Sequence, residues 1–196
     1  MYICFDVETT GIPKDYKASI CDSENWPRLV EIAWAGYDES GSQNFLRSSI
    51  VKPDGFLISP ETVRIHGITT ELAEKNGRPL EDVLSEFISD VQDPQLTFIG
   101  HNINFDINVI SAELYRLGFS LKKINEEFVN HRSLCTMMSS TEFCAIPSRR
   151  GFKWPTLSEL YFKLFGEDYN AHHAKNDVEA CAKCFFALKN QGIIKF

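Results

Sequence analysis

Acidic residues occur in this chain where a strand ends or a helix begins, and this placement restricts the fold more than any other sequence feature. Residues 2–8 read as a strand, and because strand side chains alternate between faces, Asp6 and Glu8 point the same way. Asp106 and Asp177 each open a run of helical periodicity. An α/β fold that packs both helices against the sheet would bring the four carboxylates together over the first strand.

Apolar residues at helical spacing follow both of the later acids. They are Ile110, Leu114 and Leu117 after the first acid, and Cys181, Cys184 and Leu188 after the second. A stripe that faces the sheet carries its acid toward the sheet as well. The positive end of each helix tolerates the negative charge at that position. The helical pattern therefore favours convergence of the acids.

Four carboxylates gathered at one point repel each other and lose hydration unless cations neutralise them. Hard oxygen ligands favour Mg²⁺ or Mn²⁺, and two such ions about 3.5–4 Å apart can hold the attacking and leaving oxygens of a phosphodiester in line. His172 lies five residues before Asp177, and an imidazole there can accept the proton of the attacking water. The pattern predicts two-metal phosphodiester hydrolysis.

Each acid taken alone also fits a plainer interpretation. Asp6 and Glu8 fit surface acids near a turn, whereas Asp106 and Asp177 fit first-turn acids that interact with a helix dipole. Only their joint occurrence favours a catalytic site. The adjacent His173 is the alternative candidate for the base.

Three segments resemble the motifs of the DEDDh 3′-to-5′ exonucleases, the family of RNase T and of the proofreading epsilon subunit of bacterial DNA polymerase III. Residues 6–11 match Asp-x-Glu-Thr-Thr-Gly, residues 101–106 match His-Asn-x-x-Phe-Asp, and residues 172–177 match His-x-Ala-x-x-Asp. The motifs occur in the family's order. Residues 65–69 resemble a further recurrent segment, and the resemblance extends over residues 1–188.

The resemblance implies a role for each motif residue. It makes Asp6, Glu8, Asp106 and Asp177 the ligands of two divalent cations, Mg²⁺ or Mn²⁺, and His172 the general base. The implied architecture is an α/β, RNase H-like fold, with a mixed five-stranded sheet flanked by helices. We expect a single exonuclease domain over residues 1–196.

The implied activity is removal of nucleotides from the 3′ end of single-stranded nucleic acid, with DNA favoured, to give nucleoside 5′-monophosphates. Thr9, His66 and Asn102 are the expected substrate-binding residues. The same residue set also fits an exoribonuclease or a short-oligonucleotide hydrolase, because nothing in the sequence assigns a contact to a 2′-hydroxyl. A noncatalytic, polymerase-associated nucleic-acid-binding module is the alternative of another class. Association with a polymerase and the oligomeric state stay open.

The local patterns support such a sheet. Strands are expected near residues 2–8, 29–38, 43–52, 96–100 and 133–137. The first three are close enough in sequence to form an antiparallel meander. An amphipathic helix is expected over residues 80–91, and Thr156 and Glu159 predict a capping box that opens another. Gly118 is expected to end the helix that carries Asp106.

The chain has 196 residues, 43% of them hydrophobic, and a net charge of −7. The length and apolar content suffice for one core. The negative charge argues against binding along a duplex and for a small footprint on a strand end. Arg149, Arg150 and Lys153 form one concentrated basic stretch beside Phe152 and Trp154. This mixture suits contact with a single strand, and it equally fits a solvated loop with the tryptophan packed beneath it.

Six cysteines are expected to be reduced thiols, because the chain is larger than a disulfide-stabilised scaffold and shows no secretion signal. A strand that starts at Tyr2 leaves no room for a signal peptide, and no apolar run is long enough to cross a membrane. The expected location is the cytoplasm.

Overall fold

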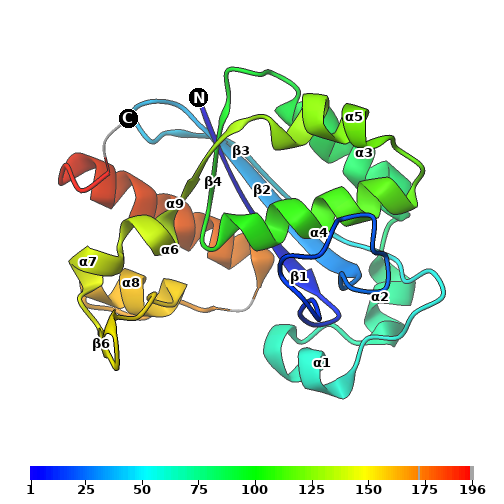
Figure 1. Ribbon diagram of the computed structural model, residues 1–196, viewed down its shortest axis with the longest axis horizontal. Coiled ribbons are helices and arrows are strands. Elements are labelled where there is room, and N and C mark those ends of the chain that lie inside the picture. The colour runs from blue at the N-terminus through cyan, green and yellow to red at the C-terminus, as the bar shows by residue number, and fades with distance from the viewer. Residues whose placement is uncertain (172, 195–196) are drawn as a thin grey trace.

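The computed structural model describes residues 1–171 and 173–194, and these form a mixed five-stranded sheet covered by helices (Figure 1). The strands are β1 (Tyr2–Thr9), β2 (Leu29–Tyr37), β3 (Gln43–Ile50), β4 (Thr97–Gly100) and β5 (Arg132–Cys135). Their order in the sheet is β3-β2-β1-β4-β5. The first three strands form an antiparallel meander, and β4 and β5 are parallel to β1. The predicted RNase H-like α/β fold is confirmed.

Helices lie on both faces of this sheet. Their bounds are α1 (Pro60–His66), α2 (Thr70–Asn76), α3 (Leu80–Val91), α4 (Ile103–Arg116), α5 (Leu121–Ile124), a π-helical turn η1 (Asn125–Val129), α6 (Thr136–Ser139), α7 (Thr141–Cys144), α8 (Leu157–Phe165) and α9 (Ala174–Asn190). A short hairpin of β6 (Pro147–Ser148) and β7 (Gly151–Phe152) precedes α8.

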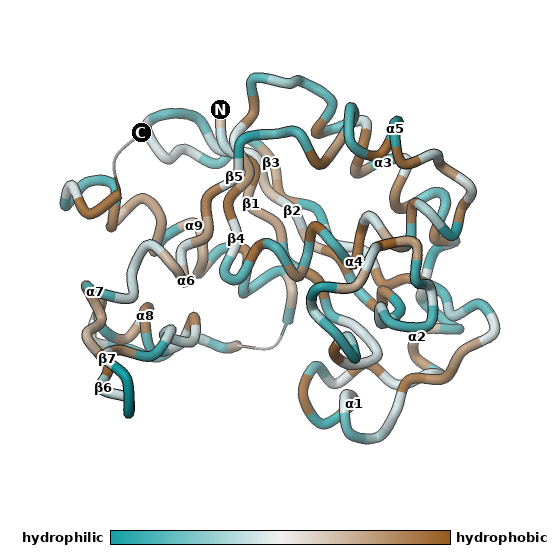
Figure 2. The backbone as a smooth tube through the Cα atoms, in the orientation of Figure 1, coloured by the Kyte–Doolittle hydropathy of each residue, from teal (hydrophilic) through white to brown (hydrophobic). Residues whose placement is uncertain are grey.

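The central strand β1 is buried on both faces, and its alternation assigns each side chain to one of two cores. Ile3 and Phe5 pack in the core that contains α3 and α4, whereas Tyr2 and Cys4 pack in the core that contains α9. Asp6 continues the series on the α9 side. In Figure 2, β1 and β4 consist mainly of hydrophobic residues, whereas the tip of the β6–β7 hairpin is hydrophilic.

Two predicted strand ends need correction. β3 ends at Ile50 rather than at residue 52, because Val51 leaves the ladder and forms an isolated parallel bridge with Arg78. β5 ends at Cys135 rather than at residue 137, because Thr136 begins α6.

The predicted helix boundaries are confirmed. Thr156 and Glu159 form the capping box of α8, with both reciprocal hydrogen bonds present. Gly118 follows the end of α4 with φ of 88°, a left-handed conformation that glycine adopts without a Cβ clash.

All six cysteines are free, and Cys181 and Cys184 are buried in the core beneath α9, as predicted. Of the helices in residues 1–171 and 173–194, none has the length and apolar character needed to span a bilayer.

Candidate active site

Three acidic side chains meet at the end of β1. One carboxylate oxygen from each of Asp6, Glu8 and Asp177 lies within 4.8 Å of those of the other two. Asp6 and Glu8 share a strand face because they are two residues apart, and α9 packs on that face with Asp177 in its first turn. The sequence prediction that the first and third motifs converge is therefore correct.

Asp106 reaches the same strand from the opposite face of the sheet. It lies in the first turn of α4, is 3% exposed, and its Oδ1 accepts a hydrogen bond of 3.1 Å from the backbone N–H of Val7. Val7 stands between Asp6 and Glu8 in the strand. The fourth acid is thus fixed to the motif that carries the first two, although it is outside the group of three close carboxylates.

The acids repel one another in the absence of cations. Burial, and then the charges of Asp106, Asp177 and Glu8, raise the pKa of Asp6 well above its usual value. Burial, with the charges of Asp177 and Glu31, raises the pKa of Glu8 to about 8. Such shifts show how strongly the site favours positive charge from protons or metal ions.

Two opposing effects act on the pKa of Asp106, the acid of the second motif. Burial raises the pKa of Asp106 well above its usual value, although the N–H groups of its own backbone and of Val7 favour the charged form. The hydrogen bond from Val7 therefore orients this carboxylate without fully compensating its lost hydration.

Tyr169 is a site residue that the sequence reasoning missed. Its hydroxyl donates a hydrogen bond of 2.5 Å to Oδ1 of Asp177, and its ring packs on Tyr161 of α8 with centroids 5.0 Å apart. The tyrosine lies in a segment without periodicity, so no pattern pointed to it. It orients Asp177 and connects the site to α8.

His172, the predicted general base, lies outside the described residues. The alternative, His173, is exposed and occupies the N-cap position of α9, where its backbone carbonyl accepts hydrogen bonds from the N–H groups of Asn176 and Asp177. Its backbone therefore helps to form the first turn of α9.

Two of the three predicted substrate-binding residues, Thr9 and His66, are buried and form hydrogen bonds to nearby backbone groups. The Thr9 hydroxyl is engaged in a tight turn, since it donates to the Gly11 carbonyl at 2.6 Å. His66 is buried and accepts a hydrogen bond from the N–H of Ile68 at 3.1 Å. Burial is the main cause that lowers the pKa of His66, the last residue of α1.

Asn102 precedes α4 in a left-handed conformation with φ of 70°. Asparagine tolerates this conformation better than most residues. Its half-buried side chain makes no capping hydrogen bond to the helix, and its backbone carbonyl accepts the N–H of Phe105. The side chain is accordingly available at the start of the helix that carries Asp106.

His101, the first residue of the second motif, has a structural role. Its Nδ1 lies 3.0 Å from the hydroxyl of Thr136, and its Nε2 lies 2.9 Å from the carbonyl of Pro155. Burial lowers the pKa of His101, which favours the neutral ring. The imidazole thereby ties the start of α4 to the segment between the β6–β7 hairpin and α8.

A buried ion-pair cluster holds the segment after β1. Glu113 of α4 is fully buried, and its Oε1 accepts from Nε of Arg28 at 2.8 Å and lies 3.2 Å from Nη1 of Arg116. The backbone N–H of Arg28 donates to the Thr10 hydroxyl, and the Thr10 N–H donates to the Arg28 carbonyl. Glu113 therefore positions the turn that follows the first motif.

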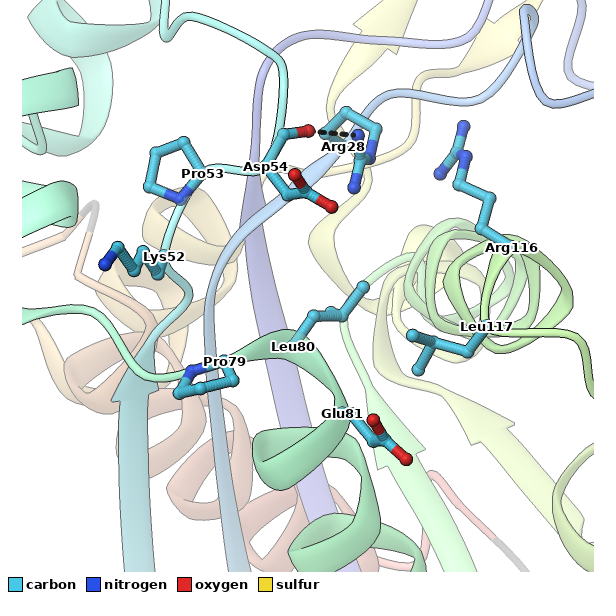
Figure 3. A pocket seen from close by; sticks show the side chains of 9 residues that line it. All are labelled: Arg28, Lys52, Pro53, Asp54, Pro79, Leu80, Glu81, Arg116 and Leu117. Atoms are coloured by element: carbon cyan, nitrogen blue, oxygen red, sulfur yellow. Dashed lines mark hydrogen bonds between the residues drawn. The ribbon is translucent and has the colours of Figure 1, made fainter.

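The two arginines also line a pocket of about 420 Å³ (Figure 3), together with Lys52, Pro53, Asp54, Pro79, Leu80, Glu81 and Leu117. Arg28 donates to the carbonyl of Asp54 there, and Arg116 donates to the carbonyls of Ser23 and Trp26. None of the four motif acids lines this pocket. The two arginines of this pocket therefore fix neighbouring loops through hydrogen bonds to their backbone carbonyls.

Glu113→Ala is expected to lower the free energy of unfolding by about 1.5–3 kcal/mol, since it removes charged hydrogen bonds to two arginines that are only partly exposed. Urea denaturation would measure the change. The control is Glu81→Ala, because Glu81 lines the same pocket but is exposed, and a surface change of this kind shifts stability by about 0.5 kcal/mol or less. Equal losses in the two variants would contradict the assigned role of Glu113.

The chain is similar in sequence to known nuclease and polymerase proteins. The RNase T family model, described as an exonuclease, matches residues 3–185. DNA polymerase III PolC-type of Streptococcus pneumoniae is 28% identical over 191 residues, which is 94% of this chain and 11% of the polymerase. Exodeoxyribonuclease I of Buchnera aphidicola is 33% identical over 149 residues, which is 70% of this chain and 30% of that protein.

Solved structures agree on the fold. Exonuclease I of E. coli in complex with a dT13 oligonucleotide has a TM-score of 0.74 and 20% identity, and the match covers 96% of this chain and 40% of that chain. The zinc-bound form of the same enzyme with single-stranded DNA has a TM-score of 0.75 at 21% identity, with 97% of this chain and 40% of that chain covered.

The sheet order, with acids from β1, α4 and α9 at one edge, defines a nuclease of the RNase H-like class. Within that class, the chain belongs to the RNase T exonuclease family, the DEDDh group that the three motifs resemble. The chain spans about a tenth to a third of the length of these curated relatives.

Proposed function

We propose that this chain removes nucleotides from the 3′ end of single-stranded nucleic acid, with DNA preferred, and releases nucleoside 5′-monophosphates. The observation that carries the proposal is the convergence of Asp6, Glu8 and Asp177 within 4.8 Å at the end of β1, with Asp106 fixed to the same strand. The names of the relatives support the preference for DNA, since one is an exodeoxyribonuclease and another was solved with an oligodeoxythymidine.

The four proposed ligands suit hard divalent cations, which prefer oxygen ligands. Asp6, Glu8, Asp106 and Asp177 offer only carboxylate oxygens, the ligands preferred by Mg²⁺ and Mn²⁺. Their raised pKa values reflect a site that lacks compensating charge. Two bound cations would supply that charge and would activate the attacking water and the leaving oxygen.

The chain's own residues have separate tasks in this reaction. The β1 backbone keeps Asp6 and Glu8 parallel, Tyr169 orients Asp177, and the Val7 N–H orients Asp106. We assign the role of proton acceptor to His172, on the basis of its spacing to Asp177 in the third motif.

We assign the terminal nucleotide to the region around Thr9, His66 and Asn102, which lie at the ends of three different elements. The buried ring of His66 gives this region a rigid part. Specificity for a free 3′ end follows if the 3′-hydroxyl lies in the turn after β1, where a further phosphate would meet the carboxylates.

The experiment that tests the activity uses matched DNA and RNA oligomers, labelled at the 5′ end, with Mg²⁺, with Mn²⁺ or with EDTA. We expect a ladder of products shortened from the 3′ end, dependent on the cation and faster for DNA. Faster digestion of RNA would favour the exoribonuclease. Binding without turnover under all conditions would instead identify a noncatalytic module and would refute the proposal.

Chemical blocking of the ends tests the direction. An oligomer with a 3′-phosphate is expected to be digested about tenfold or more slowly, because its added charge would lie unpaired beside the acids. An oligomer blocked at its 5′ end should be shortened at the normal rate. Cleavage of a circular single strand at a comparable rate would show that the enzyme is an endonuclease.

Two broader assignments are part of the same proposal. We take residues 1–196 as one exonuclease domain, since the family match covers residues 3–185 and both cores pack on one sheet. Association with a DNA polymerase is suggested by the similarity to the PolC-type polymerase. Co-purification with the replicative polymerase from the native host would test the association.

A further inference from the structure

The β6–β7 hairpin, together with the adjoining Lys153 and Trp154, presents a mixture of aromatic and basic side chains to solvent. Trp154 is 64% exposed and Phe152 is 44% exposed, and Arg149 and Arg150 at the hairpin turn are also exposed. The alternative that the tryptophan packs beneath a solvated loop is therefore wrong. Large exposed aromatic surfaces beside cations are characteristic of sites that bind single strands.

The base of the hairpin is firmly held. The N–H of Lys153 donates to the carbonyl of Ile146 at 2.9 Å, and its ammonium pairs with Glu159 at 2.6 Å. His101 contacts the carbonyl of Pro155 at 2.9 Å, at the residue after Trp154. The hairpin is thus a fixed projection, which lowers the entropy cost of using it as a contact surface.

The side chains of the two arginines at the hairpin tip form no ion pair within the described residues. Among the ion pairs formed within residues 1–171 and 173–194, none includes Arg149 or Arg150, whereas Lys153 is paired. In a chain with a net charge of −7, two adjacent unpaired cations are a local exception. A negatively charged ligand is the partner that they suit.

The hairpin stands at the edge of the sheet where the acids lie. Figure 1 shows β6 and α8 on one side of the end of β1, and α1 on the other side. Contacts support this placement, because Tyr161 of α8 packs on Tyr169 and Tyr169 hydrogen bonds to Asp177. A strand whose 3′ end occupied the acids could continue over the hairpin.

We propose that the β6–β7 hairpin is a second binding site for the single strand, upstream of the nucleotide that is removed. Trp154 and Phe152 stack on bases, and Arg149 and Arg150 contact phosphates. This inference rests on the proposed function, which it extends by a contact that a terminal nucleotide alone does not need. It also reconciles the acidic chain with a polyanionic substrate, since the cations are concentrated beside the path of the strand.

Intrinsic fluorescence gives a test that needs no turnover. The chain has three tryptophans, and Trp26 and Trp34 are buried whereas Trp154 is exposed. Titration with dT12 in EDTA is expected to quench the emission of the exposed tryptophan. Trp154→Phe should remove the quenching while the oligomer still binds, and Trp154→Ala should weaken binding about 5- to 150-fold, the usual worth of one stacked base.

Kinetics with substrates of different length separate this site from the acids. In the unmodified enzyme, KM is expected to fall as the oligomer is lengthened from two to about twelve nucleotides, as a groove that spans several nucleotides requires. Trp154→Ala should make this fall smaller, with kcat unchanged. Hydrolysis of the p-nitrophenyl ester of thymidine 5′-monophosphate, which cannot reach the hairpin, should also be unchanged.

The arginines are tested by charge reversal with a matched control. Arg149→Glu combined with Arg150→Glu should reduce the slope of log binding against log salt by about 1.4, the value for two phosphate contacts on a single strand. The control is Lys122→Glu combined with Lys123→Glu, which makes the same charge change on exposed residues of α5, away from the acids (Figure 1). For Trp154, the control is Tyr115→Ala on α4, an aromatic that is 38% exposed.

The possible failures are distinguishable. Quenching by dT12 without hydrolysis of the ester would refute the proposed function and leave the hairpin site standing. Ester hydrolysis with no quenching, and with KM of the hairpin variants unchanged at every length, would overturn the hairpin site. A change in sedimentation of Trp154→Ala with normal KM would assign the hairpin to protein association instead, which also overturns it.

Discussion

Asp106→Asn is expected to lower the rate of 3′-end hydrolysis by more than about 100-fold, because even the loss of a residue that only orients a metal ligand typically costs 10- to 100-fold. Asparagine keeps the shape and an oxygen that can accept the Val7 N–H, so the variant should fold. Initial rates on an oligomer in saturating Mn²⁺, with circular dichroism as a check of folding, would measure the effect.

The same result is expected for Asp6→Ala, Glu8→Ala and Asp177→Ala, since each removes one proposed ligand. Asp82→Asn on α3 is a suitable control, because this acid is exposed and belongs to neither core. Calorimetry with Mn²⁺ would follow the number of bound ions. Near-normal turnover together with two bound ions in Asp106→Asn would show that the acid is not a ligand.

Stability supplies an independent readout of the same carboxylate. In EDTA, a carboxyl whose pKa is raised in the folded state binds its proton more tightly there than in the unfolded state. Its contribution to stability is therefore present at low pH and is lost as the pH rises through the raised pKa. Asp106→Asn should be as stable as the unmodified protein or more so, and the difference should grow with pH.

The sequence assigned the motif acids to the correct elements, because the first motif lies on a strand and the acids of the other two lie in the first turns of helices. A strand fixes the relative direction of Asp6 and Glu8 through two-residue alternation alone. A buried apolar stripe fixes the direction of the first turn of α9, and hence of Asp177. Periodicity could not reveal that α4 and α9 cover opposite faces of the sheet, so that Asp106 arrives from the other side.

The features that the sequence did not predict depend on the tertiary surroundings of single residues, which periodicity does not encode. Tyr169 acquires its role from a hydrogen bond to Asp177 and from a ring contact with α8. Glu113 continues a helix in which it is indistinguishable by pattern from a surface acid, yet it is fully buried between two arginines. Trp154 lies between β7 and α8, where neither an alternating nor a helical pattern indicates whether a side chain is exposed.

His172→Ala is expected to lower the rate by about 10²- to 10⁴-fold, the usual worth of a positioned general base. Binding of Mn²⁺ should change far less, because the four carboxylates remain. Single-turnover rates at saturating Mn²⁺, compared with calorimetric affinities for the ion, would separate the two effects.

His173→Ala is the matched control, because the two histidines are adjacent and only His172 has the five-residue spacing to Asp177. His173 is exposed and supports α9 through its backbone carbonyl, which alanine retains, so its loss should be mild. The pH profile of the unmodified enzyme would not serve as well, because acid both protonates an imidazole and releases metal from carboxylates. A larger loss at His173 than at His172 would place the third motif one residue out of register, and equal losses would contradict the assignment of His172 as the sole base.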